Sequence, residues 1–123
     1  MIKGVKFVSI PVTDQQRALE FYTQKLGMRV VTDAPFSPEQ RWIELGIPRA
    51  ETRVVLFTAP GQEKMIGGFM NLSFASDDVE ATARELKQRG VEFVQEPKKE
   101  DWGTSAIFKD SEGNQFVLST SKG

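Results

Sequence analysis

The sequence predicts an α+β fold, in which two tandem β-α-β-β-β modules make up a single domain. The first observation is an internal repeat: Asn71 follows Phe7 by 64 positions, and Gly90 follows Gly27 by 63. The second observation is that a helical pattern follows the first strand of each half, and three extended stretches follow each helix. A repeat this long with only two copies indicates a duplicated supersecondary unit rather than a solenoid.

The first half begins with a strand over residues 7–10, where Val8 and Ile10 alternate with Phe7 and Ser9 as in a half-buried strand. Asp14 is a good N-cap for the helix that follows, and Gly27 stands where a helix needs a left-handed residue beyond its end. The apolar positions of this helix share one face. The three remaining extended stretches of this half are 28–32, 41–45 and 53–58.

The second half repeats this order, with Asp78 as the N-cap of its helix and Gly90 after the helix. Its later extended stretches are 91–95, 105–109 and 115–119, and a turn signature at 110–114 separates the last two. A glycine-rich polar linker at about 59–68 joins the modules. We therefore place module one at residues 1–60 and module two at 69–123.

The composition excludes several classes of function. The 123 residues are 39% hydrophobic and 27% charged, which is typical of a globular protein. Sixteen basic and 17 acidic residues leave a net charge of −1, which argues against a dedicated nucleic-acid binder. The absence of cysteine and histidine removes disulfides, thiolate nucleophiles, histidine metal sites and Ser-His dyads. We see no signal-peptide pattern and no apolar run that could cross a membrane, so we expect a cytoplasmic protein without a membrane partner.

Short motifs along the chain resemble one known superfamily. They are V-x-D at 12–14, a helix with Phe21-Tyr22, Leu26-Gly27 after it, and D-x-x-G-N-x-F at 110–116. In this order and at these separations they resemble the vicinal oxygen chelate superfamily, which includes glyoxalase I, bleomycin-resistance proteins and extradiol dioxygenases. The resemblance spans essentially the whole chain. It implies curled mixed sheets that together form a cleft, and it implies a homodimer.

The resemblance also identifies where a metal would lie. In metal-dependent members, four cleft residues from the first and last strand of each module hold a divalent ion, and here these positions fall on Phe7, Leu56, Asn71 and Val117. Three hydrocarbon side chains and one amide are poor ligands for such an ion. We therefore expect no metal and no cofactor, and the departure argues against metal-dependent glyoxalase or dioxygenase activity.

Strand alternation separates the strand residues into an apolar face and a mixed face. We expect the apolar face to pack under the helices; it carries Val8, Ile10, Val55, Phe57, Leu72, Phe74, Phe116 and Leu118. The mixed face carries Phe7, Ser9, Val54, Leu56, Asn71, Ser73, Gln115, Val117 and Ser119. Apolar walls with a few polar groups and small hydroxyl side chains suit a ligand cleft. The alternative is a filled core whose polar groups are satisfied internally.

Further candidates lie near the rim of this predicted cleft. Trp42 and Trp102 could stack on a planar ligand, or could instead pack against a loop or a second subunit. Glu44 and Arg53 are candidate polar anchors, and the Arg53 guanidinium could clamp a carboxylate or phosphate. The predicted ligand-binding residues are Phe7, Ser9, Trp42, Glu44, Arg53, Leu56, Asn71, Ser73, Trp102, Gln115 and Val117.

Three functions are compatible with these observations. The first is a protein of the bleomycin-resistance kind that sequesters or carries a small, partly aromatic ligand without a metal. The second is a glyoxalase-like lyase, isomerase or dioxygenase with relocated metal ligands or none, for which Glu44 is the best-placed acid. The third is a dimeric interaction module without a ligand. A small molecule and a second copy of the chain are the partners that we expect.

Overall fold

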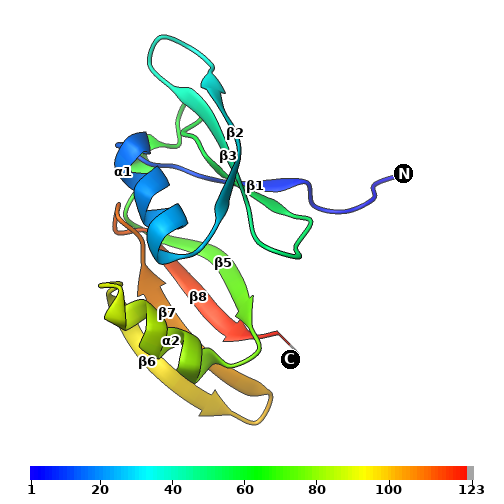
Figure 1. The fold of residues 1–123 in the computed structure, drawn as a ribbon, viewed down its shortest axis with the longest axis vertical. Helices are drawn as coiled ribbons and strands as arrows, with labels where there is room; N and C mark the ends of the chain where they lie inside the picture. The colour runs from blue at the N-terminus through cyan, green and yellow to red at the C-terminus, as the bar shows by residue number, and fades with distance from the viewer. Residues whose placement is uncertain (122–123) are drawn as a thin grey trace. The chain divides into compact units, whose positions relative to one another are not determined.

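The computed structural model describes residues 1–121, which form two four-stranded mixed sheets with few helices. The predicted α+β class is confirmed. The chain divides into two compact units, of which unit 1 is Met1–Ile66 and unit 2 begins at Gly67. Figure 1 shows α1 lying against the sheet of unit 1 and α2 against the sheet of unit 2. Within residues 1–121, no helix has the length and apolar character needed to cross a membrane.

Unit 1 contains four strands, one helix that widens at its end, and a short 3-10 turn. Its elements are β1 (Phe7–Ile10), α1 (Gln15–Glu20), a π-helical turn η1 (Phe21–Lys25), β2 (Arg29–Pro35), β3 (Arg41–Gly46), β4 (Arg53–Leu56) and η2 (Glu63–Met65). The sheet order is β1-β4-β3-β2, with β1 parallel to β4 and the other pairs antiparallel.

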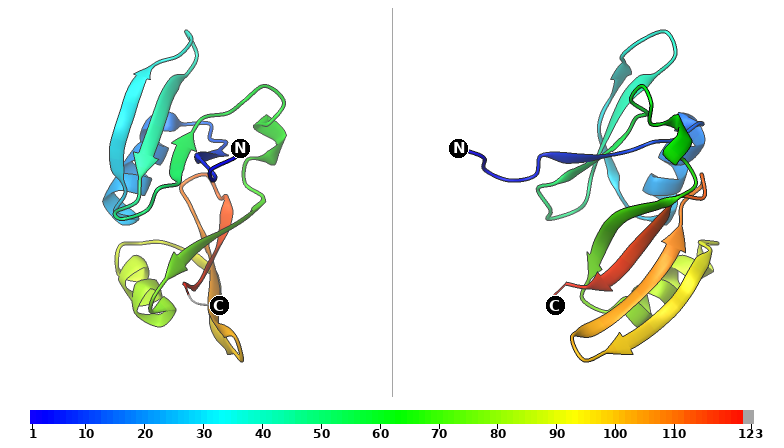
Figure 2. Two further views of the ribbon diagram at one scale, coloured as in Figure 1. Left: turned by 90° about the vertical axis from the view of Figure 1, so that its right-hand side faces the viewer. Right: turned by 180° about the vertical axis from the view of Figure 1, so that it is seen from behind.

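Unit 2 repeats this order with longer strands. Its elements are β5 (Phe69–Ser76), α2 (Val79–Gln88), β6 (Phe93–Glu100), β7 (Gly103–Lys109) and β8 (Gln115–Thr120). The sheet order is β5-β8-β7-β6, and again the first strand is parallel to the last. The two further views in Figure 2 show each helix against one face of its own sheet.

The helix ends follow the predicted capping residues. Asp14 accepts a hydrogen bond from the Arg17 amide at 3.0 Å, and Asp78 accepts one from the Ala81 amide at 3.0 Å. Gly27 adopts φ +76°, in the left-handed region that favours glycine. These contacts explain why both helices begin directly after an aspartate.

The π-helical turn at the end of α1 accounts for the difference between the two repeat offsets. A π turn takes up one extra residue without ending a helix. It also turns two consecutive aromatic residues, Phe21 and Tyr22, into the interior, where they are 8% and 0% exposed. Helix α2 has no such turn, so the second helical segment is one residue shorter.

The pairing of β1 with β4 corrects one prediction for unit 1. Val54 lies opposite Val8 and Leu56 lies opposite Ile10, so Val54 and Leu56 belong to the buried face beneath α1. The assignment of Val55 and Phe57 to that face was wrong. The physical reason is that residues 54–57 are all apolar, and a run without polar members carries no alternation from which to read which residues face the core.

In unit 2 the predicted faces are confirmed for the strands that pair regularly. Phe74 lies opposite Leu118, and Phe108 lies opposite Phe116, all on the buried face. Their rings pack at centroid distances of 5.4–6.1 Å. Ser73 and its partner Val117 lie on the other face.

Candidate functional site

Four aromatic side chains gather on the face of the unit 1 sheet opposite α1, which we call the open face. Phe7 comes from β1, Trp42 from β3, Phe57 directly follows β4, and Phe36 lies in the β2–β3 loop. Trp42 is the centre of the group, with ring centroids 5.5 Å from Phe7, 6.1 Å from Phe36 and 5.3 Å from Phe57. Phe36 and Phe57 are 4.8 Å apart in an edge-to-face arrangement. These four residues form what we call the aromatic platform.

The aromatic platform is only partly buried within unit 1. Phe36 is 62% exposed and Phe7 is 36% exposed, while Trp42 and Phe57 are half-buried. Clustered exposed aromatic rings are unusual on the surface of a monomeric protein, and such patches are common at protein–protein, membrane and ligand contacts. Single exposed apolar residues would carry no such meaning.

The loop that carries Phe36 is fixed by hydrogen bonds. The Phe36 and Ser37 amides donate to the Gln40 carbonyl at 3.1 and 3.0 Å. The Gln40 side chain then forms two hydrogen bonds with the backbone of Thr58, donating to its carbonyl at 2.8 Å and accepting from its amide at 2.9 Å. This amide clamp ties the loop to the end of β4, next to Phe57, so the platform is held in place without a ligand.

A charged pair lies at one end of the platform. The Trp42 indole nitrogen donates to Glu44 at 3.2 Å, and Arg53 donates to the other oxygen of that carboxylate at 3.4 Å. The Glu44 side chain is 19% exposed and the Arg53 side chain is 32% exposed. Glu44, the acid best placed for a catalytic alternative, is therefore engaged in orienting the indole and the guanidinium.

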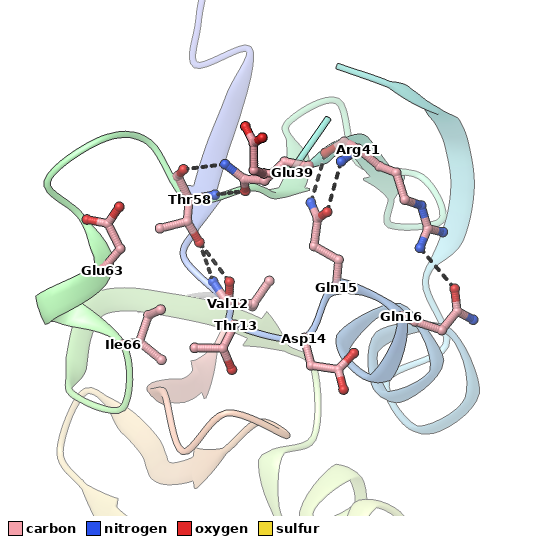
Figure 3. A pocket seen from close by; sticks show the side chains of 11 residues that line it. Val12, Thr13, Asp14, Gln15, Gln16, Glu39, Arg41, Thr58, Glu63 and Ile66 are labelled. Atoms are coloured by element: carbon pink, nitrogen blue, oxygen red, sulfur yellow. Dashed lines mark hydrogen bonds between the residues drawn. The ribbon is translucent and has the colours of Figure 1, made fainter. Parts of the chain in front are cut away.

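A pocket of about 650 Å³ lies at the other end of the sheet, between the start of α1, the β2–β3 loop and the η2 turn (Figure 3). Gln15 donates to the carbonyls of Arg41 and Leu56, both at 2.8 Å, and accepts from the Arg41 amide at 2.9 Å. The Thr58 hydroxyl exchanges two hydrogen bonds of 2.8 Å with the backbone of Val12. These polar groups form hydrogen bonds with one another, and the bonds hold the strand ends together. We therefore interpret the pocket as a structural feature rather than a ligand site.

One ion pair on this side of unit 1 shifts two pKa values. The Arg41 guanidinium donates to both oxygens of Asp33, at 3.0 and 2.7 Å. The hydrogen bonds from Arg41 lower the pKa of Asp33 below its usual value, and the same contacts raise the pKa of Arg41.

The structure brings together five of the predicted site residues, all in unit 1. Phe7, Trp42, Glu44 and Arg53 are in direct contact through the platform and its charged pair, and the Ser9 hydroxyl on the same face donates to the Phe57 carbonyl at 3.1 Å. Leu56 does not join them, because its side chain lies on the buried face.

The predicted site residues of unit 2 lie on its strands and one turn. Ser73 and Ser119 share a hydrogen bond of 2.6 Å, Val117 lies beside them, and Gln115 pairs with Phe69. Asn71 sits at an irregularity of β5 with φ +54°, which asparagine tolerates better than most residues. Trp102 is 51% exposed in the turn between β6 and β7.

Two platform members were missed from the sequence. Phe57 was assigned to the wrong face, and Phe36 was not among the predicted ligand-binding residues. Proline on both sides of the Phe36-Ser37 pair signals a constrained loop, and this was the one available indication that an exposed ring there would be held in place.

The four residues that the family resemblance assigned to a metal site do not fit a divalent cation. Phe7 belongs to the platform, Leu56 is buried hydrocarbon, and Val117 offers no donor atom, which leaves the amide of Asn71. Among residues 1–121, no three acidic side chains come together as a possible metal site.

Comparisons with known proteins identify the family. A model described as the Glyoxalase/Bleomycin resistance protein/Dioxygenase superfamily matches residues 4–118. The chain is 39% identical over 121 residues to the uncharacterized protein YetH of Bacillus subtilis, covering 96% of this chain and 98% of YetH. A superfamily member from Sphaerobacter thermophilus has a TM-score of 0.87 and 32% identity, with 98% of each chain covered. TnmS3, an antibiotic binding protein from a Streptomyces species, has a TM-score of 0.82 and 32% identity, with 97% and 96% covered. These matches confirm the resemblance carried by the motifs: the chain belongs to the glyoxalase/bleomycin resistance protein/dioxygenase superfamily.

Proposed function

We propose that this protein binds a small, partly aromatic molecule on the open face of the unit 1 sheet, and that it sequesters or carries this molecule without a metal. The observation that carries the proposal is the aromatic platform, in which four rings contact one another while Phe36 stays 62% exposed. The similarity to the antibiotic binding protein TnmS3 supports a binding role for a chain of this fold.

The energetics of the platform favour a flat ligand. Each aromatic contact contributes about 0.5–1.5 kcal/mol beyond the area that it buries, and apolar area contributes roughly 25 cal/mol per Å². The Gln40 clamp fixes the loop of Phe36 before binding, so little conformational entropy is lost when a ligand arrives. A preformed surface of this kind suits retention of a ligand.

The candidate residues of unit 2 stay a prediction. Asn71, Ser73, Gln115, Val117 and Trp102 supply polar and apolar groups of the kind that ligand sites use. Leu56 is not part of the proposal, because it faces the core beneath α1.

A fluorescence titration tests the proposal. In a Trp102→Phe background, Trp42 is the single tryptophan, and we expect 2-naphthamide, a neutral planar probe, to quench its emission saturably. Phe36→Ala should weaken binding about tenfold, since it removes a ring that the ligand would contact. Met65→Ala, which truncates another exposed apolar side chain of unit 1, should leave the affinity unchanged.

Two outcomes would contradict the proposal. One is that 2-naphthamide does not quench Trp42 at all. The other is that Phe36→Ala and Met65→Ala behave alike, which would place the binding elsewhere. Recovery of the probe chemically unchanged after prolonged incubation, measured by mass spectrometry, is the result expected of a carrier rather than an enzyme.

A further inference from the structure

A second hollow of about 360 Å³ adjoins the aromatic platform. It is lined by Lys3, Gly4, Val5, Lys6, Glu44, Glu51 and Arg53. Two contacts make it continuous with the platform: Arg53 lies opposite Phe7 in the β1–β4 pair, and the indole of Trp42 donates to Glu44. A ligand on the platform would therefore have one end at this hollow.

The N-terminal segment that forms one wall of the hollow is tied to β4. The Arg53 amide donates to the Lys6 carbonyl at 3.0 Å, and the Thr52 hydroxyl donates to the Val5 carbonyl at 2.9 Å. These bonds hold the backbone of residues 5 and 6 beside the strand that carries Arg53. These backbone contacts place Lys6 close to Arg53, and Lys3 also lines the hollow.

The hollow has an excess of cationic groups. Lys3, Lys6 and Arg53 face two carboxylates, Glu44 and Glu51, in a chain whose net charge is −1. Within residues 1–121, neither lysine has an ion-pair partner. Glu44 already accepts from Trp42 and pairs with Arg53, so part of its negative charge is compensated within the protein.

We propose that the ligand is a planar aromatic compound with an acidic group, such as a carboxylate, sulfonate or phosphate. Its rings lie on the platform and its anionic group lies in the hollow, where Arg53, Lys3 and Lys6 bind it. The planar fork of a guanidinium matches such groups better than a point charge does. This inference rests on the proposed function and adds the charge of the ligand to it.

Three naphthalene probes that share one ring system and carry an anionic, a neutral or a cationic substituent test the inference. They are 2-naphthoate, neutral 2-naphthamide and cationic 2-naphthylmethylammonium, each titrated against Trp42 emission in the Trp102→Phe background. We expect 2-naphthoate to bind about tenfold more tightly than the amide, as one charge-assisted hydrogen bond would produce, and the ammonium compound to bind most weakly. Added salt should weaken only the binding of naphthoate.

Variants identify the groups responsible. Arg53→Gln, and separately the double variant Lys3→Gln/Lys6→Gln, should each lower the ratio of naphthoate affinity to naphthamide affinity. The double variant keeps the Arg53–Glu44 pair, so it tests the inference even if Arg53→Gln folds poorly. Glu44→Gln keeps an acceptor for the indole and should increase naphthoate affinity. Arg84→Gln, on the exposed side of α2, is the matched control without effect.

The outcomes separate the two proposals. If all three probes bind equally, or if the ammonium compound binds best, the anionic ligand is wrong while the platform stands. If the preference for naphthoate persists in both Arg53→Gln and the lysine double variant, the hollow is not the anion site. If none of the probes binds, the proposed function fails and this inference fails with it.

Discussion

At the scale of single residues, Ser111 lies in a regular turn but has a side-chain hydroxyl in an unfavourable environment. The Gly113 amide donates to the Asp110 carbonyl at 3.1 Å, which closes a four-residue turn with Ser111 in its second position. The Asp110 carboxylate accepts from the Glu112 amide at 2.8 Å and from the Asn114 amide at 3.0 Å. The Ser111 hydroxyl is buried and finds no hydrogen-bond partner within residues 1–121.

Ser111→Pro is therefore expected to stabilise the protein. Proline is favoured at the second position of such a turn and reduces the entropy of the unfolded chain, which is worth about 0.4–1 kcal/mol. Removing the unpaired hydroxyl should add to this, because a buried hydroxyl without a partner is unfavourable by roughly 1–3 kcal/mol. Urea unfolding would measure the change.

A serine in unit 1 provides the control with the opposite sign. The Ser37 hydroxyl accepts hydrogen bonds from the Glu39 and Gln40 amides at 3.3 and 3.1 Å, so Ser37→Ala should destabilise. Ser111→Ala removes the hydroxyl without the effect of proline. If Ser111→Pro and Ser111→Ala both lowered the free energy of unfolding, as expected for Ser37→Ala, the Ser111 hydroxyl would stabilise the fold and the prediction would be wrong.

At the scale of elements, the β2–β3 hairpin contains an ion pair, Arg41 with Asp33, that shifts the pKa of both partners. Arg41 lowers the pKa of Asp33, so the folded state prefers the ionised carboxylate more strongly than the unfolded state does. The resulting stabilisation is present above the unfolded pKa, which is near 3.8, and is lost as the pH falls through the lower pKa of the folded state.

Asp33→Asn should lower the free energy of unfolding at pH 7 by at most about 1 kcal/mol, because both partners are about one-third exposed. The difference between the parent and the variant should shrink as the pH falls below 4. Urea unfolding at pH 7 and pH 3 measures it, with Asp101→Asn as the control, because Asp101 forms no ion pair within residues 1–121. An equal difference at both pH values would show that the effect comes from packing rather than from charge.

The elements also show which parts of the structure could be predicted. Local features could be predicted, because they depend on the residue itself and its neighbours in sequence. They include the helix caps at Asp14 and Asp78 and the turn at Gly27, and the internal repeat is visible in the sequence directly. The facing of β4 could not be predicted, because Val54 and Val55 are equally apolar and only pairing with β1 decides between them. Two of the four platform residues, Phe7 and Trp42, were predicted, because both lie on strands that the sequence pattern identifies. The position of Phe36 depends on the conformation of a loop, which the sequence pattern does not determine.

At the scale of the whole molecule, the homodimer remains a prediction. Apolar side chains are exposed at both the N-terminal segment and in strands of each unit, including Ile2, Val5, Val30 and Phe69. Exposed apolar area of this extent favours self-association. Light scattering coupled to size-exclusion chromatography should give twice the mass of one chain at micromolar concentration. The mass of a single chain across that range would contradict the prediction.

The double hydrogen bond between the Gln40 side chain and Thr58 places a side-chain oxygen where a neighbouring strand would normally supply a carbonyl. The backbone proton of Thr58 is then protected from solvent by a glutamine, not by a sheet. Its rate of exchange with deuterium would report each opening of the segment that carries Phe36, and would slow when that ring is covered by a bound molecule. Exchange at the Thr58 amide alone would thus measure the fraction of protein molecules with a ligand over Phe36.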